Sequence, residues 1–280
     1  MYLPRFLASV RICNICLCTL GVLLVSMTAR ATNGVIEVNQ ARALAGGVTA
    51  GDTPGFPVTI STAGSFRLTS NLDVSALPNA HSLSVILISA ADVTIDLNGF
   101  SIIGPVTCTG SGPTLACTNS ITAFGSGIVG NGGGTTIKNG KIRGMNLYGI
   151  TLVGADNRIE NVDVSSSGNA GIRIAGGVVS YTIASRNRGG GLVAAGNVSM
   201  HNSAAHENSS AGFSCSAPGN GIVTAGIAIG NGLQGVVACA YSSSLLRGNN
   251  SNDANPQADS ASTPLGQNSC YHSAGNTACP

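Results

Sequence analysis

The chain has 280 residues, of which 9% are charged and 4% are aromatic, with 39 glycines, no tryptophan and a formal net charge of +2. This composition excludes a disordered polyelectrolyte and differs from that of an ordinary helical enzyme. The length allows one large all-β domain or two small domains.

The first 31 residues have the pattern of a secretory signal peptide. Arg5 and Arg11 precede an apolar stretch at residues 12–25, and Ala29-Arg30-Ala31 fits the small-x-small rule for cleavage. Because the apolar stretch is short for a transmembrane helix, we predict cleavage after Ala31 and no stable membrane insertion afterwards. The mature protein would then be periplasmic, attached to the cell envelope, or secreted. An uncleaved membrane anchor is the alternative.

Removal of this segment changes both the charge balance and the cysteine count. It leaves ten basic and eleven acidic residues, so the charge gives no basis for a nucleic-acid partner. It also leaves six cysteines. An even number of cysteines in an exported chain indicates disulfides.

From residue 126 onward the sequence repeats itself. A glycine followed by an apolar residue recurs at steps of 22, 22, 20, 21 and 23 residues, and two more apolar columns recur at similar steps. Each repeat therefore has three short segments with a period of two, which indicates strands and not helices. The first column is Gly127-Ile128, Gly149-Ile150, Gly171-Ile172, Gly191-Leu192, Gly212-Phe213 and Gly235-Val236. The second is Ile137, Ile159, Val179, Val198, Ile222 and Leu245, and the third is Ile142, Val164, Ile183, Ala204 and Ile227.

These repeats predict an all-β fold, a right-handed parallel β-helix with three short strands in each coil of about 20–23 residues. Each strand would pair in parallel with its equivalent one repeat later, and the first column would be buried. The usual handedness of parallel crossovers favours the right-handed winding.

The stretch "VTIDLNGFSIIG", residues 93–104, raises the question of what Asp96 does inside a strand. Val93, Ile95 and Leu97 alternate with polar residues and should point inward, so Asp96 should face outward. Asn98-Gly99 then turns the chain, because both residues tolerate the left-handed conformation.

This stretch, together with "NLYGITLVGADNRIENVDVSSSGNAGIRI" at residues 146–174, resembles secreted bacterial right-handed parallel β-helix repeat proteins of the pectate-lyase-like superfamily. The resemblance covers roughly residues 57–250. It implies the fold but no particular activity, because the superfamily includes lyases, hydrolases, epimerases and phage tailspikes.

The rest of the chain fits around this β-helix. We expect residues 32–56 to form an N-terminal segment whose short helix, at residues 35–46, caps the first coil. The β-helix would occupy residues 57–250, and residues 251–280 would form an irregular tail. Spacing suggests three disulfides, Cys108–Cys117 in an inserted loop, Cys215–Cys239 one coil apart and Cys270–Cys279 in the tail, although sequence alone does not fix connectivity.

Several charged residues fall one coil apart and have two interpretations. Lys138 and Glu160, Lys141 and Asp163, and Arg186 and Glu207 would form a ladder of surface ion pairs, each worth at most about 1 kcal/mol. Alternatively, one face carries a charged groove lined by Lys141, Arg143, Asp163, Arg186, His201, His206 and Glu207.

Catalysis in that groove would be polysaccharide lysis or hydrolysis. Lys141 or Arg143 would act as the base, Asp163 as the acidic helper, and Arg186 would complete the site. Asp163 and Glu207, two coils apart, would lie roughly 10 Å from each other, a separation that hydrolysis allows. The motifs of polygalacturonases and a Gly-x-Ser-x-Gly elbow are absent.

No cofactor is expected. His201 and His206 lack further zinc ligands, and Asp156, Glu160 and Asp163 are grouped closely enough for calcium but are interleaved with cationic residues.

The sequence therefore favours an exported, non-catalytic module that is structural or binds glycan weakly, with a polysaccharide as partner. A polysaccharide lyase or glycoside hydrolase is the alternative. Tyr148, Tyr181 and Tyr241 are not one coil apart, so they form no aromatic stripe for a sugar chain. The asparagines near the repeat ends, Asn169, Asn187, Asn208 and Asn231, are expected to stack and hydrogen-bond to one another.

Overall fold

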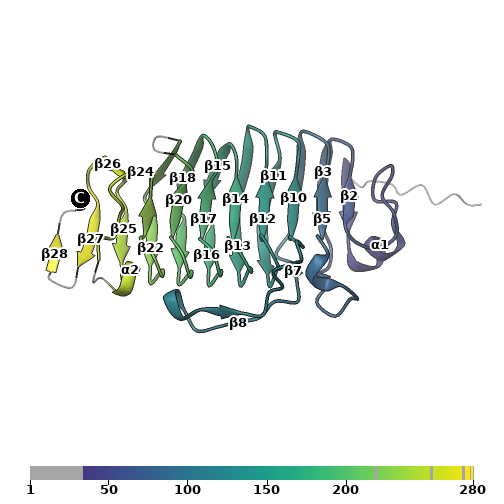
Figure 1. Ribbon diagram of the computed structural model, residues 1–280. Helices are drawn as coiled ribbons and strands as arrows, with labels where there is room; N and C mark the ends of the chain where they lie inside the picture. The colour runs from purple at the N-terminus through teal and green to yellow at the C-terminus, as the bar shows by residue number, and fades with distance from the viewer. Residues whose placement is uncertain (1–33, 218–219, 253–254, 273–274, 278, 280) are drawn as a thin grey trace, which may run out of the picture. The chain divides into compact units, whose positions relative to one another are not determined.

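The computed structural model describes residues 34–217, 220–252, 255–272, 275–277 and 279. The predicted signal peptide lies outside these residues. The described chain winds as a parallel β-solenoid whose coils follow one another along a single axis (Figure 1). No helix in the described part of the chain is long and apolar enough to cross a membrane.

One wall of the solenoid is a parallel sheet that takes one short strand from each coil. Its register pairs Ile128 with Ile150, Ile150 with Ile172, and Ile172 with Leu192, which confirms the first predicted column. The eight strands are β2 (Val58–Ile60), β5 (Ile86–Ile88), β10 (Ile128–Gly130), β12 (Ile150–Leu152), β14 (Ile172–Ile174), β17 (Leu192–Ala194), β20 (Phe213–Cys215) and β23 (Val236–Val237).

The other two walls form one continuous sheet, because β11 (Thr136–Arg143) and β13 (Asn157–Ser165) run through both. We call these walls the second and third ladders. Besides β11 and β13, which belong to both, the second ladder contains β1 (Val35–Val38), β3 (Gly64–Leu68), β6 (Val93–Asp96), β15 (Gly177–Ser180), β18 (Val198–His201), β21 (Gly221–Thr224), β24 (Ala240–Ser242) and β26 (Thr263–Pro264). The third contains β4 (Leu72–Asp73), β7 (Ser101–Ile103), β16 (Ile183–Ser185), β19 (Ala204–His206), β22 (Ile227–Ile229), β25 (Leu245–Arg247) and β27 (Ser269–His272).

The elements outside these walls are short. They are the helices α1 (Gln40–Ala45) and α2 (Asn249–Asn252), the 3₁₀ turns η2 (Ala80–Ser82) and η3 (Gly112–Thr114), the hairpin strands β8 (Cys108–Thr109) and β9 (Ala116–Cys117), and β28 (Gly275–Thr277), which pairs antiparallel with β27.

The predicted helix at residues 35–46 is only half correct. Residues 35–38 form β1, which pairs in parallel with β3, because this β-branched stretch completes a sheet edge. Asn39 then caps α1, its side chain accepting the Arg42 N–H at 2.9 Å. Strand pairing also continues past residue 250, through β26 and β27.

The second and third predicted columns are wrong in their later coils. Val179 pairs with Met200, not Val198, and Met200 pairs with Val223. In the third ladder the buried residues Ala184, Ala205 and Ala228 lie one position after those predicted, and Leu246 follows them. Leu245, expected in the second column, lies in β25 of the third ladder. Since side chains alternate across a strand, a shift of one residue turns Ile183 and Ile227 outward, where they are 40% and 39% exposed.

Asp96 is the last residue of β6 and stabilises the turn that follows. It faces outward as predicted, and its carboxylate accepts the backbone N–H of Asn98 at 2.9 Å and the side-chain amide of Asn139 at 3.2 Å. Asn98 and Asn139 both have positive φ, 52° and 60°, at the corner between the second and third ladders. Asp96 therefore holds the corners of two neighbouring coils together.

A ladder of buried asparagines runs through the later coils. The Asn187 amide donates to Asn208, Asn208 to Asn231, and Asn231 to Asn249, at 2.8–2.9 Å. This confirms the predicted stacking for Asn187, Asn208 and Asn231. Asn169 lies outside the ladder, because Ser167 occupies the equivalent position in its coil.

The three predicted disulfides are all present in the described residues. Cys108 bonds to Cys117, Cys215 to Cys239 and Cys270 to Cys279. Cys215–Cys239 joins consecutive coils, as its separation of 24 residues suggested.

Candidate functional site

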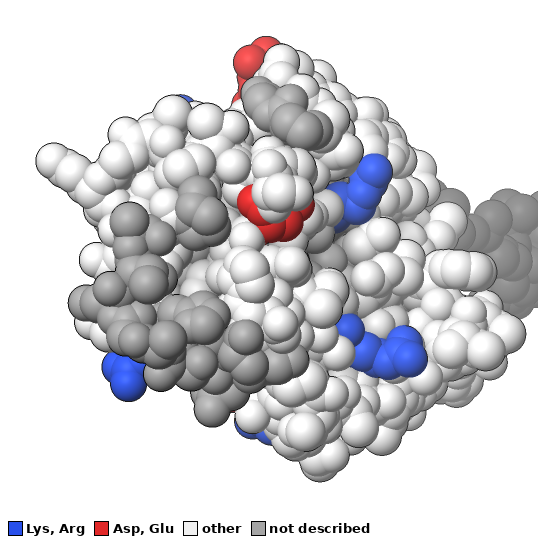
Figure 2. All heavy atoms as spheres, turned by 60° about the vertical axis from the view of Figure 1, so that its left-hand side comes forward, with Lys and Arg blue, Asp and Glu red and all other residues white. Residues whose placement is uncertain are grey.

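The charged ladder has the predicted register but does not form ion pairs. Lys138 lies opposite Glu160, and Lys141 lies opposite Asp163, on β11 and β13. Within the described residues, however, no lysine or arginine nitrogen lies within 4.0 Å of a carboxylate oxygen. On the face that Figure 2 shows, charged side chains stand apart from one another among uncharged ones. These charges therefore do little to hold the coils together.

Lys141 and Asp163 line a hollow of about 380 Å³ at the corner of the second and third ladders. Lys141 is exposed and Asp163 half-buried, and both point outward from their strands. Asn139 and Asn161 line the same hollow, and the Asn161 amide donates to Asn139 at 3.2 Å. Neither charged side chain has a hydrogen-bond partner in the described residues. Both are therefore available to a ligand.

The register separates the two carboxylates that hydrolysis would need. Asp163 is aligned with Ile183 and, one coil further, with Ala204, whereas Glu207 lies three residues beyond Ala204. Two coil spacings and three residues of strand correspond to about 14 Å between the α-carbons. The α-carbons are therefore farther apart than the roughly 10 Å expected from coil spacing alone.

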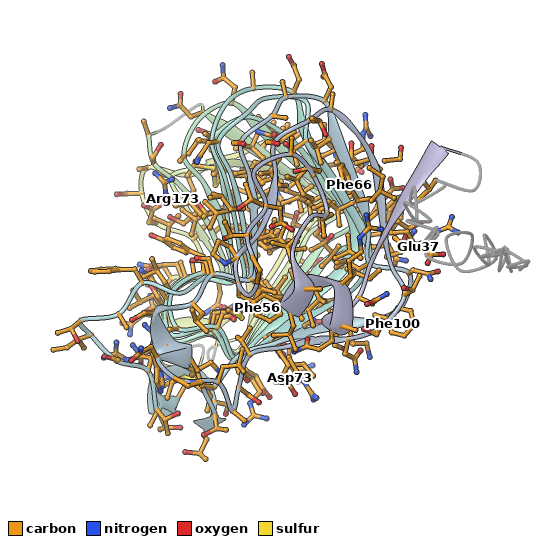
Figure 3. The ribbon with its side chains drawn as sticks, turned by 90° about the vertical axis from the view of Figure 1, so that its right-hand side faces the viewer. Glu37, Phe56, Phe66, Asp73, Phe100 and Arg173 are labelled. Atoms are coloured by element: carbon orange, nitrogen blue, oxygen red, sulfur yellow. A yellow bond between two sulfur atoms is a disulfide. The ribbon has the colours of Figure 1, made fainter. Side chains whose placement is uncertain are left out.

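An inserted arm, residues 104–125, lies along one corner of the solenoid. Figure 1 shows β8 running beneath the coils, and the view along the axis in Figure 3 shows the arm projecting beyond their outline. The Val106 N–H donates to the Gly144 carbonyl at 2.8 Å, and the Gly112 N–H to the Glu207 carbonyl at 3.0 Å. The arm is closed on itself by β8, β9 and the Cys108–Cys117 disulfide.

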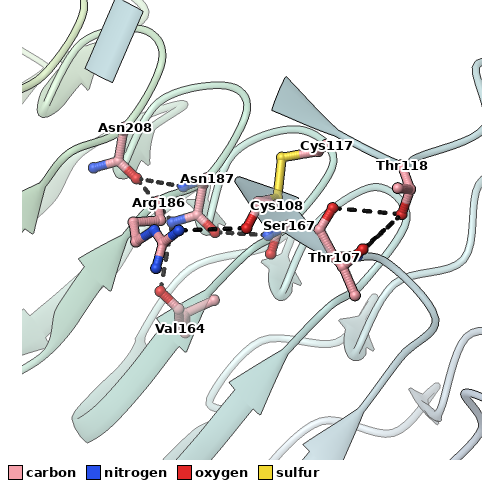
Figure 4. The surroundings of a disulfide bond; sticks show 9 residues. All are labelled: Thr107, Cys108, Cys117, Thr118, Val164, Ser167, Arg186, Asn187 and Asn208. Atoms are coloured by element: carbon pink, nitrogen blue, oxygen red, sulfur yellow. Dashed lines mark hydrogen bonds between the residues drawn. A yellow bond between two sulfur atoms is a disulfide. The ribbon is translucent and has the colours of Figure 1, made fainter. Parts of the chain in front are cut away.

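Arg186, a predicted groove residue, is directed toward this arm. Its Nη2 donates to the Cys108 carbonyl at 3.3 Å, across 78 residues of sequence (Figure 4). Its Nε is buried and has no hydrogen-bond partner in the described residues. The four predicted catalytic residues therefore do not converge on one point: Lys141 and Asp163 share a hollow, whereas Arg143 and Arg186 lie elsewhere.

Arg143 lies in a second hollow, of about 500 Å³, between the arm and the third ladder. Val106 and Thr107 form its arm side, and Ser165 and Ser166 come from the next coil. Arg143 is exposed, and its guanidinium has no partner among the described residues. One side of the arm thus carries an unpaired cation beside hydroxyl groups.

A third hollow, of about 280 Å³, lies on the opposite flank of the arm and was missed by the sequence analysis. Phe124 and Ile121 from the arm line it and are 69% and 84% exposed, beside Arg188 and Asn169 from the coils. The arm here is held by the buried Asn146, whose side chain bonds to the backbone of Ser120 and Ala123 and to His81. A search for aromatic residues spaced one coil apart cannot find Phe124, because the arm is outside the repeat.

No group of three or more potential ligands among His, Cys, Asp and Glu is found in the described residues. Burial lowers the pKa of His206 below its ordinary value of 6.5, and the nearby Glu207 opposes this shift. His206 is therefore neutral near pH 7, consistent with a half-buried position on β19.

Three solved structures are similar to this chain. The Dettilon tailspike protein matches with a TM-score of 0.55 and 18% identity, over 85% of this chain and 53% of that one. The A-module of the mannuronan C-5 epimerase AlgE4 from Azotobacter vinelandii gives a TM-score of 0.48 and 13% identity, over 86% and 79%. A pectate lyase, Pel9A, gives 0.43 and 14%, over 85% and 61%. This chain thus spans about half the length of the tailspike.

Identities of this size show the fold alone. No curated protein sequence matches. The sequence does match the family described as the right-handed β-helix region, over residues 126–277, which is more than half of the chain. These are the coils whose repeats and parallel register are described above. The chain belongs to the right-handed β-helix family.

Proposed function

We propose that the protein is exported through the segment at residues 1–31 and binds an extended acidic polysaccharide along the flanks of the arm, without cleaving it. The observation that carries this proposal is an exposed guanidinium on each flank, Arg143 on one and Arg188 on the other, neither of which has a partner among the residues that the structure describes. A guanidinium binds a carboxylate through two parallel hydrogen bonds, so such groups suit the acid groups of a uronic sugar.

The surroundings of these two arginines support a sugar ligand. Phe124 offers an exposed aromatic face on which a sugar ring can pack, and the carbonyl of the neighbouring Ala123 accepts a hydrogen bond from Asn146. Ser165, Ser166 and Asn169 supply hydroxyl and amide groups near the two guanidinium groups. Because the arm is fixed before binding, little conformational entropy is lost when a ligand arrives.

The positions of Asp163 and Glu207 support binding without hydrolysis, because a glycosidase needs two carboxyl groups at one site. Asp163 lines a hollow with Lys141, whereas Glu207 lies two coils further along, where its backbone carbonyl accepts the Gly112 N–H of the arm. Export is supported by the three disulfides, which persist in oxidising compartments.

A lyase is the second candidate because two oppositely charged residues lie opposite each other on adjacent strands. Lys141 lies directly opposite Asp163, and both line the same hollow. Either Lys141 or the nearby Arg143 would remove the proton next to a uronic carboxylate, with Asp163 as the acidic helper. Arg186, which contacts the arm, would act only through the arm.

The test is affinity electrophoresis of the oxidised protein, expressed from the full chain, in gels that contain acidic or neutral polysaccharides. We expect retardation by an acidic polysaccharide, weakened at least about tenfold in Arg143→Ala and in Arg188→Ala. Arg158→Ala is the matched control, because Arg158 is exposed on β13 but lines none of these hollows. Equal retardation of all four proteins, or none by any acidic polysaccharide, would refute the proposal.

A further inference from the structure

The arm crosses several coils at equivalent positions. Its base bonds to Gly144, its middle to Arg186 and its tip to Glu207, and each of these three residues lies at the corner that follows the third ladder. All three have positive φ, of 71°, 52° and 54°. The arm therefore runs parallel to the solenoid axis, from the coil of β11 to that of β19, as Figure 1 shows.

The tip of the arm fits closely against the next coil. A Cβ atom on Gly112 would lie 2.5 Å from the carbonyl oxygen of Gly230. A distance this short leaves no room for a side chain, so glycine at position 112 permits the contact. The docked position of the tip is thus specific.

The hairpin inside the arm behaves as one closed unit. Cys108 and Cys117 are bonded, and the Thr118 N–H donates to the Thr107 carbonyl at 3.0 Å while the Thr107 N–H donates to the Thr118 hydroxyl, also at 3.0 Å. A group that holds Cys108 therefore holds the whole hairpin, residues 107–118.

Arg186 is that group. In the described part of the chain, it is the one coil side chain that donates a hydrogen bond to residues 107–118. It adopts a left-handed conformation that is unfavourable for arginine, and its buried Nε lacks a partner there. Both features raise the free energy of the folded state, and the hydrogen bond to the Cys108 carbonyl is the interaction that offsets them (Figure 4).

We propose that Arg186 is a positioning residue, which fastens the arm as a strap across the corners of the coils and so keeps the hollows on both flanks in shape. Arg186 itself does not touch the ligand. The effect of Arg186 on ligand binding rests on the proposed function, whereas its effect on the position of the arm is independent of that proposal.

The test measures the arm directly by hydrogen exchange. In Arg186→Met the guanidinium is lost, and we expect the Gly112 amide, which bonds to Glu207, to exchange about tenfold faster or more. Reduction of Cys108–Cys117 by dithiothreitol should accelerate relative to that of Cys215–Cys239. Arg186→Lys keeps a cationic donor and should restore slow exchange, and Arg158→Met should change neither rate.

A second variant guards against a folding defect. Arg186→Gly suits the positive φ at this position and also removes the guanidinium, so it should give the same fast exchange in a folded protein. Unchanged exchange at Gly112 in the Met and Gly variants would overturn the proposal.

Binding separates the two proposals. Weaker binding of acidic oligosaccharides in Arg186→Gly, by about threefold or more, together with fast exchange, would support the strap. Fast exchange with unchanged binding, while Arg143→Ala loses binding, would overturn the positioning role and leave the proposed function standing. If the wild-type protein binds no acidic glycan, the proposed function fails, and the strap is decided by exchange and reduction alone.

Discussion

A pair of lysine substitutions at adjacent positions tests the register of the third ladder. Ala184 is fully buried, whereas its neighbour Ile183 is 40% exposed and lies opposite Asp163. In Ala184→Lys a charge would be forced into the core at a cost of several kcal/mol, with about 1–3 kcal/mol more for overpacking. In Ile183→Lys the stem of the side chain can cover the same surface and the ammonium can face Asp163, so the cost should stay below about 1 kcal/mol.

Thermal unfolding followed by circular dichroism measures this difference. For a chain of this size, about 1 kcal/mol corresponds to a shift of about 2–4 °C in Tm. We therefore expect Ile183→Lys to unfold within about 4 °C of the wild type, and Ala184→Lys to unfold at least about 10 °C lower or not to fold. Equal losses in the two variants, or a greater loss in Ile183→Lys, would refute the register and restore the column expected from the sequence.

Three other predictions concern stability. Asn208→Ala breaks the asparagine ladder and leaves several buried groups unpaired, so chemical denaturation should show that the free energy of unfolding falls by about 3–5 kcal/mol. The control, Asn197→Ala at an exposed position, should lose less than about 1 kcal/mol, and similar losses in the two variants would argue against a stabilising role of the ladder. Burial lowers the pKa of His206 in the folded protein below 6.5, so the unfolded chain binds more protons below that pH, and Tm should fall as the pH drops from 6.5 through the folded-state pKa. His206→Gln should reduce this fall in Tm, and a pH profile of Tm unchanged by the substitution would contradict the prediction. Replacing both cysteines of Cys215–Cys239 by alanine should cost about 3.5 kcal/mol by the chain-entropy relation for a loop of this length, and a double variant as stable as the wild type would show that the bridge adds nothing.

The sequence predicts the first column correctly for a physical reason. The glycine before the buried residue lies against a side chain of the third ladder in most coils, and Gly171 lies against Asn187; a Cβ atom on Gly127 would be 2.6 Å from Ile142 Cγ2. Only glycine fits at this point, so the glycine and the apolar residue recur together. The third column fails because its buried residues shrink to Ala184, Ala205 and Ala228, and larger apolar residues such as Ile183 lie just outside.

The candidate site is harder to predict because it depends on the arm, which is not part of the repeat. Coil spacing correctly brings Lys141 beside Asp163. It gives no information about Arg186, whose partner is 78 residues away in an insertion, or about Phe124, which has no equivalent in other coils. A periodic pattern specifies neighbours in adjacent coils, whereas contacts made by an insertion depend on where its loop docks.

Binding without cleavage is tested most directly by incubating the oxidised protein with the acidic polysaccharide that it binds and analysing the polysaccharide by chromatography, with and without calcium. We expect the polysaccharide to be bound and recovered at its original length, without unsaturated ends. Shortened or unsaturated products that disappear in Arg143→Ala would contradict this expectation and establish the hollows beside the arm as the active site of an enzyme.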